Sequence, residues 1–212
     1  MVHVKNHTNV SHHRYEAFLT DEECSHIAKV FTRYERDVLN IPNPDPTLSY
    51  HGLTRQHNVY NWLNHPDIRP LGIPQRLLEL ELFQNVDHIK VQCWGNLLRQ
   101  GESIEQHSHC DHTSILNNAR SSSPIQPMFA SNIFLEGTTP SYTHYEDTGR
   151  CANILGEIHL VGGYHEHQVK TNVYRRPRIS LAMDIFYDEL NDDKKWGFHN
   201  KIRFIDAYRS NA

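Results

Sequence analysis

Residues 106–112, with the sequence QHSHCDH, contain five possible metal ligands within seven positions. They follow residues 88–98, in which apolar and polar side chains alternate as in a strand with one buried face. Residues two apart on an extended backbone face the same side, so His107, His109 and Asp111 can point into one cavity. A metal ion needs such a group of lone-pair donors on a stiff backbone. The segment therefore predicts a metal site.

Two more histidines, His165 and His167, lie in residues 162–169 (GGYHEHQV), after another predicted strand. Eleven residues after His167 a strand begins in which Arg178 and Ser180 share one face. Arginine offers a planar pair of donors to a carboxylate, and serine offers a single donor. Beside a metal site, these two side chains predict a receptor for a carboxylate ligand.

The order of these features resembles the iron(II)/2-oxoglutarate-dependent oxygenases, in particular a compact bacterial and phage branch that has HxH where relatives have HxD. The opening helix, which begins FLTDEEC at residue 18, is similar to that of prolyl 4-hydroxylases. The likeness extends over residues 16–188. After the helix it is carried, in chain order, by Trp94 and Asn96 on one strand, Gly101 six residues before His107, His167 and Val169 as HxV, and Arg178 and Ser180 as RxS.

The resemblance implies a double-stranded β-helix, or jelly roll, with helices bracing one sheet. It implies iron(II) held by two ligands from residues 107–111 and by His167. The co-substrate 2-oxoglutarate would chelate the iron and rest its far carboxylate on Arg178 and Ser180, and molecular oxygen would be the other co-substrate. The expected reaction is hydroxylation of a small polar metabolite, an amino acid or a peptide residue. Asn96 is a candidate contact to 2-oxoglutarate or to the substrate.

Two ligand pairs stay open within residues 107–111. The family spacing from Gly101 selects His107, places His109 where relatives have aspartate, and gives a three-histidine site. Ligand chemistry instead selects His109 and Asp111, which restores two histidines and one carboxylate. His109 belongs to both pairs.

Alternatives exist for the neighbouring histidines and for the function. His165 shares a strand face with His167 and is a candidate neighbour of the metal rather than a ligand, and His159 is expected to be structural. A cupin-like metalloenzyme without 2-oxoglutarate is the main alternative function, and a non-catalytic metal-binding β-sandwich is the other. A halogenase is disfavoured, because neither position 109 nor position 111 holds the small residue that admits chloride.

The composition is that of an ordinary globular protein, with 38% hydrophobic and 22% charged residues among 212. A net charge of −4 argues against nucleic acid as a partner. No apolar run approaches the roughly 18 residues of a membrane span, and the first residues lack the apolar core of a signal peptide. The four cysteines show no CxxC pair, which favours a reducing compartment. We therefore expect a cytoplasmic enzyme that acts on a small molecule or peptide, as a monomer or homodimer.

The chain is expected to form one domain of the mainly β class with helices (α+β). Thr20 and Glu23 form a capping-box pattern before apolar residues at helical spacing, which predicts a helix over 21–37. The predicted layout is a helical support over 16–87, a β-core over 88–190 and a C-terminal extension over 191–212.

Shorter elements are predicted from local periodicity and from breaker residues. Helices are expected at 56–64 and 75–86. Strands are expected at 88–98, 128–136, 154–161 and 178–187. Polar segments rich in Gly, Pro or Ser predict surface loops at 40–54, 117–126 and 138–153.

Overall fold

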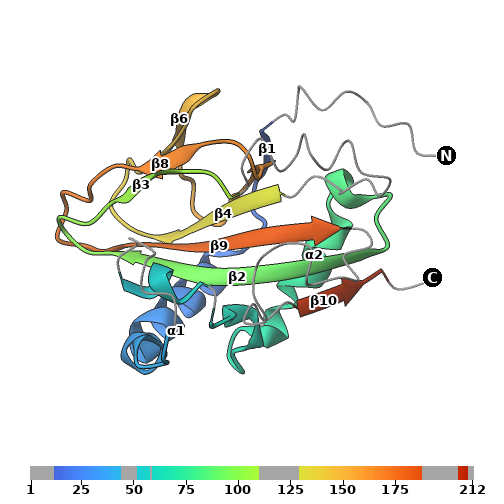
Figure 1. The fold of residues 1–212 in the computed structure, drawn as a ribbon, viewed down its shortest axis with the longest axis horizontal. Helices are drawn as coiled ribbons and strands as arrows, with labels where there is room; N and C mark the ends of the chain where they lie inside the picture. The colour runs from blue at the N-terminus through green and yellow to red at the C-terminus, as the bar shows by residue number, and fades with distance from the viewer. Residues whose placement is uncertain (1–11, 44–51, 58, 110–128, 188–204, 210–212) are drawn as a thin grey trace.

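The computed structural model describes residues 12–43, 52–57, 59–109, 129–187 and 205–209. Within them the chain forms two antiparallel sheets that face each other, with helices beside the larger one (Figure 1). The larger sheet has six strands in the spatial order β1 (His13–Tyr15), β7 (Ile158–Gly162), β4 (Phe129–Glu136), β9 (Arg178–Tyr187), β2 (His88–Leu98) and β10 (Ile205–Tyr208). The smaller sheet has four, in the order β3 (Ile104–His107), β8 (His167–Val169), β5 (Tyr142–Tyr145) and β6 (Gly149–Ala152).

The first helix, α1 (Asp21–Leu39), begins at the predicted capping box. The Thr20 hydroxyl accepts a hydrogen bond from the Glu23 backbone N–H at 3.2 Å, and the Glu23 carboxylate accepts one from the Thr20 N–H at 2.9 Å. These bonds satisfy backbone donors that the helix itself leaves without partners. The apolar side of the helix, which includes Ile27 and Phe31, is buried. The predicted helix is confirmed, and it continues two residues beyond position 37.

The six-stranded sheet separates two environments. On β2, the odd-numbered residues of 89–97 pack toward the helices, whereas Trp94, Asn96 and Leu98 face the smaller sheet. Gly95 lies so close to α1 that a Cβ atom there would come within 2.7 Å of the Phe31 ring. The helix therefore packs directly on the backbone of the strand.

Strand β9 repeats this division beside β2. The register pairs Asn96 with Ser180, so Arg178 and Ser180 both lie on the inner face, as predicted. Ile179 lies on the opposite face, in the core beneath the helices. The same alternation brings Asp184 to the inner face farther along the strand. The inner face of the sheet therefore carries polar and charged groups.

Several predictions of local structure need correction. The strand at 88–98 is confirmed, but both of its faces are buried from Val91 onward, because helices cover one and the smaller sheet covers the other. The helix expected at 75–86 is shorter, because Leu80 adopts an extended conformation with φ −67° and ψ 144°. In its place the chain forms α2 (Ile73–Glu79) and then a 3-10 turn, η4 (Glu81–Phe83).

The helix expected at 56–64 is also wrong. This part of the chain contains two separate 3-10 turns, η1 (Gly52–Gln56) and η2 (Trp62–Asn64), and a third, η3 (Arg69–Leu71), follows. Trp62 is fully buried between α1 and the sheet. Burial of a few large side chains, rather than helical periodicity, thus determines the path of this segment.

The segment 138–153 differs most from its prediction as a surface loop. Its residues form the β5–β6 hairpin, and β5 also pairs with β8. Thr143 and Tyr145 are 2% and 4% exposed. The segment is polar because its inward side chains belong to a polar cavity, which composition alone does not distinguish from a loop.

Residues near the end of the chain also join the larger sheet. Ile205–Tyr208, within the predicted C-terminal extension, forms β10 and pairs antiparallel with β2. The predicted loop at 117–126, and residues 44–51 of the predicted loop at 40–54, lie outside the described residues.

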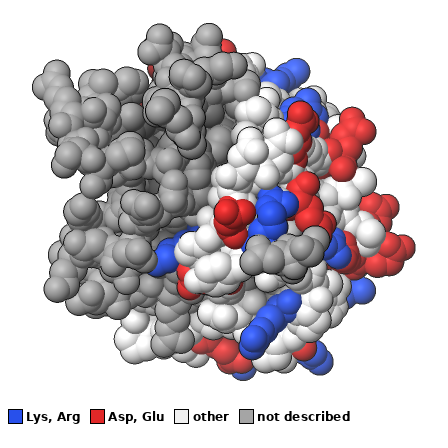
Figure 2. All heavy atoms as spheres, turned by 90° about the vertical axis from the view of Figure 1, so that its right-hand side faces the viewer, with Lys and Arg blue, Asp and Glu red and all other residues white. Residues whose placement is uncertain are grey.

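No helix in the described part of the chain is long and apolar enough to cross a membrane. On the face shown in Figure 2, the described residues carry Lys and Arg side chains interspersed with Asp and Glu. The absence of a nucleic-acid partner and the cytoplasmic location stay predictions.

Candidate metal and co-substrate site

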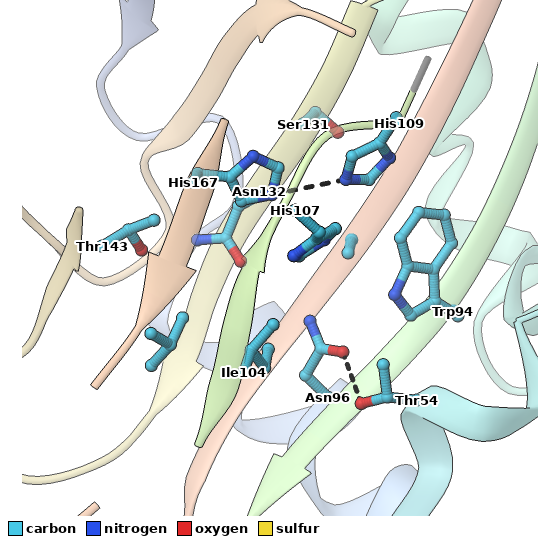
Figure 3. Close-up of a pocket in the computed structure, with 12 residues that line it drawn as sticks. Thr54, Trp94, Asn96, Ile104, His107, His109, Ser131, Asn132, Thr143 and His167 are labelled. Carbon is cyan, nitrogen blue, oxygen red and sulfur yellow. Dashed lines mark hydrogen bonds between the residues drawn. The ribbon is translucent and has the colours of Figure 1, made fainter. Parts of the chain in front are cut away.

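Three of the predicted ligands come together between the two sheets. His107 ends β3, His167 begins β8, and the two residues are direct cross-strand partners. His109 follows β3 and is held by a hydrogen bond of 2.7 Å from its N–H to the Gly163 carbonyl. One ring nitrogen from each histidine lies within 4.8 Å of those of the other two. Figure 3 shows the three side chains converging on one point.

Two of the rings have backbone carbonyl oxygens next to their Nδ1 atoms. The distance is 2.8 Å from His107 Nδ1 to the Glu105 oxygen and 3.1 Å from His167 Nδ1 to the His165 oxygen. A carbonyl oxygen can only accept, so Nδ1 carries the proton in both rings and the lone pair lies on Nε2. Metal-binding histidines are typically fixed in this way. His165 thus contacts the cluster through its carbonyl oxygen.

His109 has a carboxylate in the same position. Its Nδ1 lies 2.5 Å from the Asp184 carboxylate, and the two side chains are only 7% and 11% exposed. The Trp94 ring stacks on the His109 ring, with centroids 5.5 Å apart. With Nδ1 protonated, the Nε2 atom of His109 faces the Nε2 atom of His167 at 3.3 Å. Two lone pairs at this distance repel each other unless a cation lies between them.

The charge state of His107 and His167, and the 3.3 Å spacing of the His109 and His167 Nε2 atoms, fit a divalent metal ion. Burial, and then the charge of neighbouring His109, lower the pKa of His107 to about 4. Burial, and then the other two histidines, lower the pKa of His167 well below its usual value. Both rings are therefore neutral at pH 7, the form that binds metals. Two nitrogens each about 2.1 Å from one ion, at a right angle, lie about 3.0 Å apart.

Of the alternative ligand pair, His109 and Asp111, the structure describes only His109. Asp111 lies outside the described residues, as do Cys110 and His112. The described residues bring His107 and His109 together with the distal histidine. The choice between His107 and Asp111 as ligand stays a prediction, because Asp111 is not among the described residues.

The other predicted receptor is a buried arginine. Arg178 is 5% exposed, and its guanidinium donates to Ser180 Oγ at 3.2 Å and to Thr143 Oγ1 at 3.3 Å. Its Nε atom has no hydrogen-bond partner, and no carboxylate among the described residues forms an ion pair with it. Burial lowers the pKa of Arg178 to about 10. A desolvated guanidinium with hydroxyl neighbours is well suited to an incoming carboxylate.

A pocket extends from the histidines toward the neighbours of Arg178. It contains about 400 Å³ of space between protein atoms, part of it open to solvent, and its walls include Asn96 and Thr143. Asn96 is 4% exposed and accepts a hydrogen bond from the Thr54 hydroxyl at 2.8 Å (Figure 3). Its amide nitrogen lies 3.4 Å from Ser180 Oγ. The predicted contact residue thus lies on the pocket wall next to Ser180, whereas Arg178 itself lines an adjoining pocket that shares Val169.

Two residues of the site, Asp184 and Thr143, are absent from the sequence-based prediction. A signal exists for Asp184, because it continues the alternation that places Arg178 and Ser180 on one face of β9. No comparable signal exists for Thr143, which lies in the segment predicted as a loop. Only the pairing of β5 with β8 brings it to the arginine.

No family model matches the sequence, and no curated protein matches it. Solved structures do match. A prolyl-4-hydroxylase from Pseudomonas putida is similar with a TM-score of 0.53 at 15% sequence identity, over 85% of this chain and 89% of that chain. The non-haem α-ketoglutarate-dependent epimerase SnoN from nogalamycin biosynthesis has a TM-score of 0.54 at 11% identity, over 87% and 81%. HygX from Streptomyces hygroscopicus, solved with nickel and 2-oxoglutarate bound, has a TM-score of 0.54 at 10% identity, over 84% and 82%.

At these identities the likeness shows the fold. The described strands and helices form the predicted double-stranded β-helix, braced by helices on the larger sheet. A shared fold does not by itself fix the reaction, so the function has to be argued from the residues in the pocket.

Proposed function

We propose that this protein is a non-haem iron(II)- and 2-oxoglutarate-dependent dioxygenase of the hydroxylase type. The observation that carries the proposal is the complementarity within one barrel: three imidazoles with converging Nε2 atoms, and a buried guanidinium with no carboxylate partner among the described residues. A molecule with an oxo-acid at one end and a carboxylate at the other matches both. The bound nickel and 2-oxoglutarate of HygX, which shares the fold, support this pairing.

In this proposal His107, His109 and His167 hold iron(II). The bound iron supplies the redox chemistry that couples the decarboxylation of 2-oxoglutarate to the oxidation of a C–H bond by oxygen. Arg178 and Ser180 bind the far carboxylate, whose oxygen atoms provide the charged acceptor that the buried guanidinium lacks. This contact orients the oxo-acid end toward the histidines.

The pocket walls have a separate role. Ile104 and Val169, which pack together in a small apolar cluster, keep water away from one side of the pocket. Asn96 is fixed by Thr54 and offers its amide to 2-oxoglutarate or to the substrate. As substrate we propose a small polar metabolite, an amino acid or a peptide residue, acted on in the cytoplasm.

Anaerobic calorimetry with iron(II) and then 2-oxoglutarate tests the proposal. The wild-type chain should bind iron, and the iron-loaded chain should then bind 2-oxoglutarate. Arg178→Met should keep the iron and lose most of its affinity for 2-oxoglutarate. Arg176→Met is the matched control. Arg176 lies two residues before Arg178, is exposed, and forms an ion pair with Glu136.

Two results would overturn the proposal. The first is that Arg178→Met binds iron and leaves the measured affinity for 2-oxoglutarate unchanged, as expected of a cupin-like metalloenzyme that does not use Arg178. A non-catalytic metal-binding β-sandwich would bind iron and show no affinity for 2-oxoglutarate in any variant.

A further inference from the structure

We propose that Asp184 is a positioning residue of the metal centre. It fixes the His109 ring with Nε2 toward the metal, and it supplies, one hydrogen bond away, the negative charge that a carboxylate ligand provides in a two-histidine-one-carboxylate site. The inference rests on the proposed function, because it requires that His109 bind a divalent metal.

The contact between Asp184 and His109 is short and shielded from solvent. The distance from Nδ1 to Oδ1 is 2.5 Å, and both side chains are almost fully buried. Hydrogen bonds with an ionised partner are stronger than neutral ones, and a low-dielectric environment strengthens them further. The carboxylate therefore restricts the rotation of the ring far more than a contact in water would.

The carboxylate also has a rigid support. Asp184 lies on β9, a strand paired on both sides, where its register partners are Gln92 of β2 and Ala130 of β4. His109, in contrast, lies beyond the end of β3, where its backbone N–H donates to the Gly163 carbonyl. The bond to Asp184 ties this ligand to the larger sheet, whereas His107 and His167 belong to paired strands of the smaller sheet.

The three rings differ in the charge of their Nδ1 partners. His107 and His167 donate to neutral carbonyl oxygens, whereas His109 donates to a carboxylate. A carboxylate acceptor raises the electron density of the ring, so the Nε2 lone pair binds a metal ion more strongly. Three neutral imidazoles leave a divalent ion with a charge of +2. With Asp184 the buried unit carries +1, the same as with two histidines and one carboxylate ligand.

The chain contains a matched pair outside the pocket. His88 Nε2 and Asp206 Oδ1 lie 2.7 Å apart, between β2 and β10, with side chains 30% and 43% exposed. This pair has the same two residue types on the same sheet but in contact with solvent. Asp206→Asn is therefore a control for the general effect of neutralising a histidine-bound carboxylate.

The experiment compares Asp184→Asn with Asp206→Asn. Asparagine keeps the size of the side chain and an oxygen that can accept from Nδ1, and it removes the charge. Cobalt(II) affinity, measured by competition with a chelating dye under nitrogen, should fall about 10- to 100-fold in Asp184→Asn and stay unchanged in Asp206→Asn. In the zinc-loaded wild type, proton NMR should show the His109 Nδ1 proton far downfield, and Asp184→Asn should move it upfield.

The outcomes separate this inference from the proposed function. A wild type that binds no cobalt would overturn the proposed function. A wild type that binds cobalt, with Asp184→Asn of equal affinity, would overturn the role of Asp184 alone. If Asp184→Asn does not fold, the wild-type spectrum decides, since the lack of a downfield Nδ1 proton would contradict the charged hydrogen bond.

Discussion

The two faces of strands β2 and β9 differ sharply in chemistry. Toward the helices, the described residues of these strands are apolar side chains and Gly95, whereas toward the smaller sheet the same strands present Asn96, Arg178, Ser180 and Asp184. Apolar contacts on the first face stabilise the fold. Polar groups on the second face are buried at a free-energy cost that their hydrogen bonds offset only in part, since Arg178 Nε has no partner. Substitutions on the two faces should therefore change different measurable quantities.

Phe31→Ala, on the helix side, should have the largest effect on stability. Phe31 is fully buried, its ring centroid lies 4.4 Å from that of Trp62, and it packs against Gly95. Truncation of a buried phenylalanine lowers the free energy of unfolding by about 3–5 kcal/mol. Urea denaturation measures the loss. Phe31→Leu, the control, should lose less because it leaves a smaller cavity. If Phe31→Ala instead lost much of its metal affinity and kept its free energy of unfolding, the division between the faces would be contradicted.

Arg178→Met, on the inner face, should show the reverse. The buried guanidinium has hydroxyl partners and no carboxylate among the described residues, and burial lowers its pKa to about 10. Replacing it with an apolar side chain should lower the free energy of unfolding by no more than about 1 kcal/mol, or should raise it. Affinity for 2-oxoglutarate should nevertheless fall strongly. Urea denaturation and calorimetry on one preparation measure both quantities, and a loss near that of Phe31→Ala would show that Arg178 stabilises the fold.

The division between the faces could be predicted from the sequence where the signals are local. The alternation of β9 places Arg178 and Ser180 on one face, and the capping box at Thr20 marks the start of α1. Both signals need only a few neighbouring residues. The same alternation contains Asp184, but its meaning depends on where His109 lies, and that is set by the pairing of β3 with β8 across a long stretch of chain.

Other parts of the site could not be predicted, because non-local pairing determines them. Thr143 lies in a polar hairpin whose composition resembles that of a surface loop, and only its position between β6 and β8 makes it part of the interior. The failure at 56–64 has a similar origin, since Trp62 is fixed by its packing against Phe31 rather than by a helix of its own. A buried segment with polar side chains is therefore mistaken for a surface loop when burial is inferred from apolar composition.

Besides His107 and His167, the pair His12 and His159 should make the metal-free protein sensitive to acid. His12 Nε2 lies 3.0 Å from His159 Nδ1. Burial, and then the charge of His159, lower the pKa of His12 to about 4, and burial also lowers the pKa of His159. The unfolded chain binds these protons near pH 6.5, so the free energy of unfolding should fall as the pH drops from about 6.5 toward 4.

Urea denaturation across this pH range, with a chelator present, measures the effect. His12→Gln should reduce the pH dependence, because the side chain no longer takes up a proton on unfolding. A slope unchanged by His12→Gln would show that other groups cause the acid sensitivity.

The smallest effect on stability is expected at the exposed arginine beside the site. Arg176 and Glu136 form an ion pair at 3.2 Å, with side chains 60% and 32% exposed. Exposed ion pairs contribute about 0–1 kcal/mol and weaken with salt, so Arg176→Met should change the urea midpoint little and less at high salt. Arg176 and Arg178 carry the same charge two residues apart, and only Arg178 is desolvated. If Arg176→Met lost as much affinity for 2-oxoglutarate as Arg178→Met, the co-substrate would be responding to overall charge and not to the buried guanidinium.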